Sequence, residues 1–128
     1  MDAARSVVIT LALIECFVFG GLVGRARGRF GIAAPAMTGH PDFERINRVH
    51  QNSIEQLVLF VPAIWIFASS VSPRIAAALG LVFVIGRAVY ARGYIQEASK
   101  RGTGMAIASV ALIGLLLGAA IGSLLAAF

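Results

Sequence analysis

The chain has 128 residues, of which 59% are hydrophobic and only 13% are charged, and its mean hydropathy is +0.86. A soluble domain usually contains about 45–50% apolar residues, so this composition excludes an ordinary soluble protein and indicates an integral membrane protein. The net charge of +5 does not point to nucleic acid, because the basic residues gather in two connections between apolar runs, where anionic head groups account for them.

A helix that crosses the hydrocarbon core of a bilayer needs about 20 apolar residues. The sequence therefore has room for four membrane-spanning helices and predicts a single all-α domain over residues 1–128, a four-helix bundle with no separate soluble domain and no metal site. We expect the helices at residues 6–24, 43–71, 74–97 and 105–125.

The first expected helix, residues 6–24, carries one carboxylate, Glu15, near its middle. Charged groups at that depth usually face a bundle interior or a water-filled cavity, and we expect Glu15 to make a hydrogen bond to a packed helix. The segment that follows alternates Arg25, Arg27 and Arg29 with small residues and is then interrupted by glycine and proline. This pattern is typical of a loop.

The second expected helix opens with the polar run ERINRVHQNSIEQ and then becomes wholly apolar. We expect Asp42, which follows Pro41, to be its N-cap. At 100° per residue, Arg48, Asn52 and Glu55 fall within about 60° of one another. One face of this helix therefore presents a cation, an amide and a carboxylate, which predicts a binding site for a small charged ligand.

The third expected helix carries Arg87, Tyr90 and Tyr94 on one face, since they are spaced by three and four residues. At a rise of 1.5 Å per residue they lie about 20 to 30 Å from the start of this helix. That depth matches the polar face of the second helix, if the two helices are antiparallel. The two faces together predict one pocket.

The fourth expected helix has Gly114, Gly118 and Gly122 at intervals of four residues, a strip on which another helix can approach closely. Basic residues concentrate in the first and third connections. The positive-inside rule therefore predicts that both connections, and the pocket beside them, face the cytoplasm, with both termini on the opposite side.

The donors and acceptors of the pocket predict the class of its ligand. Arginine forks suit carboxylates, Asn52 can both donate and accept, Glu55 can hold an ammonium group, and the tyrosines bring hydroxyl groups on rigid rings. Glutathione has two carboxylates, one ammonium group and several amide groups, and it fits this inventory.

Four segments of the sequence resemble the MAPEG family, the membrane-associated proteins in eicosanoid and glutathione metabolism. They are PDFERINRVHQNSIE in the second expected helix, PRIA and residues 86–94 in the third, and the SKR that follows it. Within the family the chain is similar to the microsomal glutathione transferases and leukotriene C synthase, and most similar to the third microsomal type. The resemblance implies a homotrimer with each site between neighbouring subunits. It also implies that glutathione is conjugated to a lipophilic electrophile from the membrane lipid, or used to reduce lipid hydroperoxides.

The resemblance further implies roles for individual residues. Arg101 matches the arginine proposed to stabilise the glutathione thiolate. Seven others match positions that hold glutathione or line its site: Arg27, Arg48, Asn52, Glu55, Arg87, Tyr90 and Tyr94.

Two other functions stay open. A small multidrug antiporter also has four short helices, and it would use Glu15 to exchange protons for a cationic drug in a bundle otherwise nearly free of intramembrane charge. A non-catalytic, lipid-binding member of the same family is the second alternative. The resemblance argues against it, because that branch lacks the equivalent of Arg48.

Some of these side chains also have simpler explanations. Arg48 and Glu55 can form a purely structural ion pair. Arginines 25, 29 and 45 are expected to contact lipid head groups.

Overall fold

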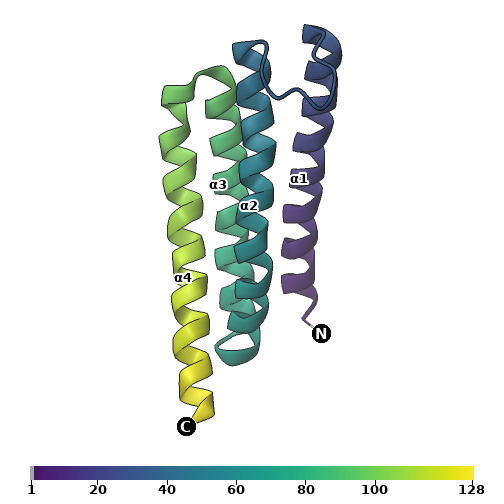
Figure 1. The fold of residues 1–128 in the computed structure, drawn as a ribbon. Coiled ribbons are helices and arrows are strands. Elements are labelled where there is room, and N and C mark those ends of the chain that lie inside the picture. Colours follow the sequence, from purple (N-terminus) through teal and green to yellow (C-terminus); the bar gives the residue numbers. More distant parts are fainter. Residues whose placement is uncertain (1) are drawn as a thin grey trace.

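The computed structural model describes residues 2–128, and its four long helices lie side by side in one bundle (Figure 1). The helices are α1 (Ala3–Phe30), α2 (Pro41–Ser70), α3 (Pro73–Gln96) and α4 (Gly102–Ala127), and the short 3-10 helix η1 (Ala98–Arg101) precedes the last of them. Four helical segments are long and apolar enough to cross a membrane. The predicted all-α, four-helix fold is confirmed.

Helix α1 ends later than the sequence pattern predicted. Arg25, Arg27 and Arg29 lie on its last two turns rather than in a loop. Arginine is a good helix former, and no proline interrupts the chain before Pro35. The helix stops at Gly31, which adopts the left-handed conformation with a φ of 67° that commonly closes helices.

The start of α2 also differs from its prediction. The N-cap is His40, whose Nδ1 accepts a hydrogen bond from the backbone N–H of Asp42 at 3.1 Å. Pro41 takes the first helical position, for which its fixed φ and missing N–H are suited. Asp42, the predicted N-cap, lies inside the first turn, where it pairs with Arg45.

Helix α4 begins at Gly102, three residues before the predicted position. The glycine strip of α4 packs against other residues of the same chain. A Cβ atom on Gly118 would lie 2.1 Å from the ring of Phe67, and one on Gly122 would lie 2.7 Å from the side chain of Val71. Two of the three glycines therefore pack α4 against α2. The strip gives no independent argument for contacts between subunits.

The interior contains one large apolar cluster and two smaller ones. The large cluster centres on the stacked rings of Phe60 and Phe83, whose centroids are 4.1 Å apart. The smaller clusters lie around Tyr90 and around Phe43. Large apolar side chains such as Phe17, which is 83% exposed, cover the outside, as expected of a surface that faces lipid hydrocarbon.

Candidate functional site

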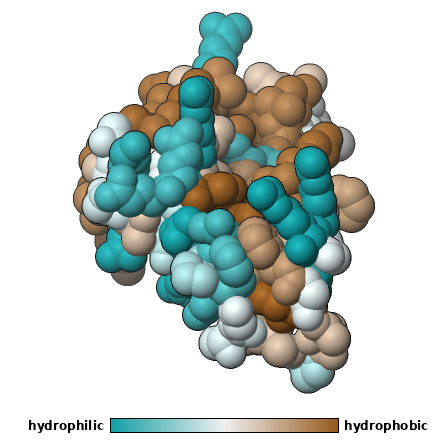
Figure 2. Space-filling view, turned by 90° about the horizontal axis from the view of Figure 1, so that it is seen from above, coloured by the Kyte–Doolittle hydropathy of each residue, from teal (hydrophilic) through white to brown (hydrophobic). Residues whose placement is uncertain are grey.

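The candidate site lies toward the end of the bundle that carries the α1–α2 connection and η1 (Figure 1). Seen from this end, the molecule shows clusters of hydrophilic side chains with apolar side chains visible between them (Figure 2). The polar side chains of the site project from α2 and α3, and η1 adds a further arginine.

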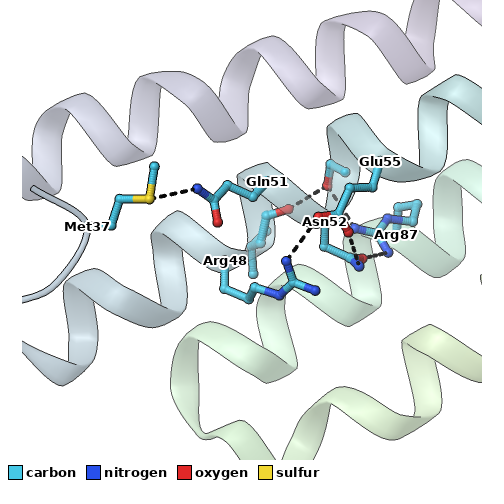
Figure 3. Close-up of polar contacts among 8 residues, drawn as sticks. Met37, Arg48, Gln51, Asn52, Glu55 and Arg87 are labelled. Atoms are coloured by element: carbon cyan, nitrogen blue, oxygen red, sulfur yellow. Dashed lines mark hydrogen bonds and ion pairs between the residues drawn. The ribbon is translucent and has the colours of Figure 1, made fainter. Parts of the chain in front are cut away.

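Arg87 is the buried centre of the site, with only 3% of its surface exposed. One nitrogen of its guanidinium group, Nη1, donates a hydrogen bond to Oδ1 of Asn52 at 2.8 Å, and the other, Nη2, donates to Oγ of Ser53 at 2.8 Å. Ser53 in turn donates to the carbonyl oxygen of Val49 at 2.7 Å. The planar fork of an arginine can satisfy two acceptors at once, so Arg87 fixes α3 against α2 at this depth (Figure 3).

The next contacts lead from Asn52 to the outside of α2. Because Oδ1 of Asn52 accepts from Arg87, its Nδ2 is left to donate to Glu55, at 3.5 Å, and Nη1 of Arg48 donates to the same carboxylate at 3.2 Å. The side chains of Arg48 and Glu55 are 48% and 57% exposed. An ion pair this exposed contributes little to stability, so both charges are available to a ligand.

Aromatic rings extend the same chain of contacts toward α4. The guanidinium of Arg87 lies over the ring of Tyr90, 4.2 Å from its centroid, and Tyr90 stacks on Tyr94 with centroids 5.6 Å apart. Arg101 lies over Tyr94 at 5.7 Å. Cations over ring faces at such distances are attracted by the ring quadrupole. We call the connected set from α2 to Arg101 the polar network; it contains Arg48, Asn52, Ser53, Glu55, Arg87, Tyr90, Tyr94 and Arg101.

Two close backbone approaches hold η1 and the start of α4 beside α3. A Cβ atom on Gly104 would lie 2.0 Å from the backbone nitrogen of Tyr90, and one on Gly93 would lie 2.3 Å from the carbonyl oxygen of Lys100. Only glycine permits backbones to come this close. This packing determines where Arg101 stands relative to the two tyrosines.

Arg27 is the one predicted site residue that the chain does not bring to the network. Its Nη1 donates to the carbonyl oxygen of Ala36 at 2.7 Å, and its guanidinium lies 4.9 Å from the ring centroid of Phe43. Within residues 2–128, no hydrogen bond or ion pair joins Arg27 to the network. Seven of the eight predicted residues are thus connected, and Arg27 is held at the α1–α2 connection.

Ser53 is a member of the network that the sequence analysis missed. It follows Asn52 directly, so on a helix its side chain points about 100° away from that of Asn52 and outside the polar face that was recognised. The signal for it was a hydroxyl group at the start of an apolar segment, whose oxygen can accept a hydrogen bond from another helix while it donates to its own.

Glu15 lies near the network, but within residues 2–128 its side chain does not make the hydrogen bond that we expected. It lines a small cavity of about 10 Å³ together with Arg87 and Ser53, and the Nε of Arg87 is buried there without a partner in residues 2–128. The bundle therefore holds a fixed cation close to Glu15. This differs from the nearly charge-free interior that the antiporter alternative requires.

Comparison with known proteins agrees with this architecture. The sequence profile of the MAPEG family matches residues 6–121. The chain is 36% identical to microsomal glutathione S-transferase 2 of Homo sapiens over 109 residues, which cover 85% of this chain and 74% of the relative. It is 35% identical to leukotriene C4 synthase of Bos taurus over 96 residues, 75% of this chain and 63% of the relative.

A further relative is an uncharacterized protein of Synechocystis, sll1147, which is 45% identical over 114 residues, 89% of this chain and 83% of the relative. That this chain is most similar to the third microsomal type of transferase stays a prediction. The four apolar helices and the profile match over most of the chain lead to one conclusion: this is an integral, multi-pass membrane protein that belongs to the MAPEG family.

Proposed function

We propose that the protein is a membrane-bound glutathione transferase and that the polar network is its glutathione site. The observation that supports this most directly is the unbroken chain of contacts from Arg48 through Arg87 to Arg101. It links, on α2, α3 and η1, all of the predicted site residues except Arg27. The names of the relatives, glutathione S-transferase and leukotriene C4 synthase, agree with the proposal.

The exposed ion pair between Arg48 and Glu55 suits the γ-glutamyl end of glutathione, which carries an ammonium group and a carboxylate. The ligand can exchange this pair for two new ones, its carboxylate on Arg48 and its ammonium on Glu55, so no charge loses its partner. Asn52, held in one orientation by Arg87, presents a fixed amide to the peptide backbone of glutathione.

Arg101 is the proposed catalytic residue. A cysteine-like thiol has a pKa of about 8.5, and a fixed guanidinium beside it favours the thiolate, which is the nucleophile. Lowering this pKa by one unit corresponds to about 1.4 kcal/mol of preferential thiolate binding. The thiolate then forms a carbon–sulfur bond with the electrophile while a leaving group such as chloride departs with the bonding electrons, and the thiol proton goes to water.

The same thiolate can reduce a lipid hydroperoxide. It attacks the outer peroxide oxygen, the O–O bond breaks, and a second glutathione releases water and forms the disulfide, leaving the lipid alcohol. Both reactions need a lipophilic substrate, which we propose reaches the site from the bilayer. We propose further that the basic end of the bundle faces the cytoplasm, with both termini on the other side.

Arg27 suggests how the site is completed. Its separation from the network within one chain fits a homotrimer in which Arg27 of one subunit reaches glutathione bound to the network of the next. The half-exposed position of Arg48 and Glu55 on the outside of α2 leaves room for such a neighbour.

Conjugation of glutathione to chlorodinitrobenzene by the purified protein tests this function. At a glutathione concentration below the KM, Arg48→Ala and Arg101→Ala should both lose most of the activity, whereas Arg92→Ala, which replaces an exposed arginine on α3 outside the network, should keep it. Absence of conjugation in the wild-type protein, with glutathione binding intact by calorimetry, would support the non-catalytic alternative. Absence of both would reject the proposed site.

A further inference from the structure

A second cavity, separate from the polar network, opens at the same end of the bundle. Its volume is about 440 Å³, and it lies between the last turns of α1, the first turns of α2 and the end of α3. Three arginines line it, Arg25 and Arg29 from α1 and Arg45 from α2, and none of them belongs to the polar network. The cavity is therefore a candidate site for a second ligand, distinct from the ligand of the polar network.

The charge of the cavity is positive and only partly compensated. Asp42 contributes the single carboxylate of the lining, and Arg45 engages it while its Nε donates to the carbonyl oxygen of Ile95 at 3.3 Å. Three arginines and one aspartate leave a formal charge of +2. Within residues 2–128, Arg25 and Arg29 form no ion pair, and their spacing of four residues places both guanidinium groups on one face of α1.

The remaining wall is apolar, which distinguishes this cavity from a simple anion site in water. Leu22 lies one turn closer to the middle of α1 than the arginines, and Ile46 and Ile95 line the wall from α2 and α3. A molecule bound here meets cations at one end and hydrocarbon at the other. That is the chemistry of a lipid with an anionic head group.

The depth of the cavity agrees with such a ligand. Helix α1 has 28 residues, about 42 Å at 1.5 Å per residue, and so exceeds the roughly 30 Å of the hydrocarbon core. Residues 6–24, which are apolar apart from Glu15 and a few small polar side chains, account for about that thickness, so the last turns with Arg25 and Arg29 are expected at the level of the head groups. The cavity volume also falls within the range of about 300–1,000 Å³ that is usual for sites of small ligands.

We propose that this cavity binds the phosphate group of an anionic phospholipid from the surrounding bilayer. Arg25 and Arg29 hold the phosphate from α1, Arg45 closes the site from α2, and the first carbons of the acyl chains lie along Leu22 and Ile46. The lipid joins three helices at the end of the bundle where the polar network lies. The proposal does not depend on the catalytic role of the network.

Calorimetric titration of the detergent-purified protein with dioctanoyl phosphatidylglycerol, dioctanoyl phosphatidylcholine and inorganic phosphate tests this proposal. The phosphatidylglycerol should bind at least about fivefold more tightly than the phosphatidylcholine, since each arginine near a membrane surface contributes roughly that factor. Arg25→Gln and Arg29→Gln should each weaken phosphatidylglycerol binding by about fivefold. Inorganic phosphate should bind weakly to the wild-type protein and to both variants.

Arg92→Gln is the matched control, because it removes an exposed arginine from the same end of the bundle but outside the cavity. If it weakens binding as much as Arg25→Gln, the attraction is diffuse surface charge and the proposal is wrong. If inorganic phosphate binds as tightly as phosphatidylglycerol and competes with it, the site takes a free anion rather than a lipid. Circular dichroism and glutathione conjugation, measured in parallel, separate loss of the lipid site from loss of the fold or of the proposed transferase activity.

Discussion

Arg87 of α3 makes two hydrogen bonds to α2, and most of the polar network is built on these two helices. Its two terminal nitrogens each have a hydrogen bond of 2.8 Å to an acceptor on α2, and it is almost fully buried. Removing a partner from a buried acceptor costs about 1–3 kcal/mol. The hydrogen bond from Arg87 to Oδ1 of Asn52 also fixes the orientation of the Asn52 amide.

Arg87→Lys should therefore affect both stability and binding. The ammonium group of lysine acts as a point and cannot reproduce the planar fork, so the apparent free energy of unfolding in an SDS titration should fall by about 2 kcal/mol. Glutathione affinity should fall with it, because Asn52 loses its orientation. Arg74→Lys makes the same change at an exposed position on the same helix and should alter neither quantity; equal effects of the two substitutions would contradict the role of Arg87.

Arg48 and Arg101 stand at opposite ends of the network, and we expect their loss to affect different kinetic constants. Arg101→Ala should lower kcat by about 100-fold, the usual effect of removing one group that stabilises developing or bound negative charge, while the KM for glutathione changes by less than about threefold. Arg48→Ala should raise that KM by about tenfold and leave kcat nearly unchanged, because a charge-assisted hydrogen bond contributes about 1.5–3 kcal/mol to binding.

The measurement is steady-state conjugation at saturating electrophile with glutathione varied. An equal loss of kcat and of affinity in Arg101→Ala would remove the catalytic role that we assign to it. Arg92→Ala again serves as the variant that changes charge without touching the network.

The sequence predicted the parts of the candidate site that depend on residues along one helix, but not the parts that depend on contacts between helices. The shared faces of Arg48, Asn52 and Glu55 and of Arg87, Tyr90 and Tyr94 followed from helical periodicity, and the contact between Arg87 and Asn52 confirms the predicted equal depth. Ser53 was missed because Arg87, which donates a hydrogen bond to it, lies on another helix. Periodicity within one segment cannot say which face of α2 meets α3.

At the scale of the helices, the sequence predicted that four membrane-spanning helices exist but misplaced some of their ends. Apolar length is enough to recognise a membrane helix, and glycine and arginine between two apolar segments do not by themselves end one. Helix α1 continues to Phe30 because its arginines favour helix and only Gly31 adopts the left-handed cap. The end of a helix depends on one or two residues, whereas its existence depends on about twenty.

Gly104 is the position where helix packing and the candidate site depend on each other most directly. A Cβ atom there would meet the backbone nitrogen of Tyr90 at 2.0 Å, and backbone cannot rotate away as a side chain can. Gly104→Ala should push the start of α4 away from α3 and carry Arg101 away from Tyr94. We expect at least a tenfold loss of conjugation activity together with lower thermal stability.

Gly114→Ala on the same helix is the control for this prediction. Its added Cβ would meet Leu79 at 3.8 Å, an ordinary van der Waals contact, and alanine is favoured over glycine inside a helix by about 1 kcal/mol. Activity should be unchanged and stability equal or higher. If Gly104→Ala behaved in the same way, the close approach of α3 and α4 would not position Arg101.

For the whole molecule, the proposed homotrimer implies that more than one chain builds each site. Arg27 contacts Ala36 and Phe43 of its own chain and stands apart from the network, although the family resemblance assigns it to the glutathione site. The observed contacts and the implied role of Arg27 agree under our proposal that each site combines Arg27 of one subunit with the network of its neighbour. Residue patterns within one chain do not test this proposal, because the contacts that it requires lie between copies.

Co-expression of two inactive variants tests the shared site. We expect Arg27→Ala and Arg101→Ala each to lose most conjugation activity when expressed alone. If the proposed trimer forms, a site in a mixed trimer is intact where an Arg101→Ala subunit supplies Arg27 to the network of an Arg27→Ala subunit. With random assembly this holds for about one site in four, so about a quarter of the wild-type activity should return.

Arg48→Ala with Arg101→Ala is the control pair, since both residues belong to the network of one chain. No assortment of subunits can place an intact Arg48 and an intact Arg101 in the same site, so co-expression should restore nothing when conjugation is measured at a glutathione concentration below the KM. Recovery in the first pair alone requires that a site spans two subunits. If neither pair recovers while doubly tagged mixed oligomers are isolated, Arg27 acts within its own chain, and its contacts with Ala36 and Phe43 then describe its role in holding the α1–α2 connection.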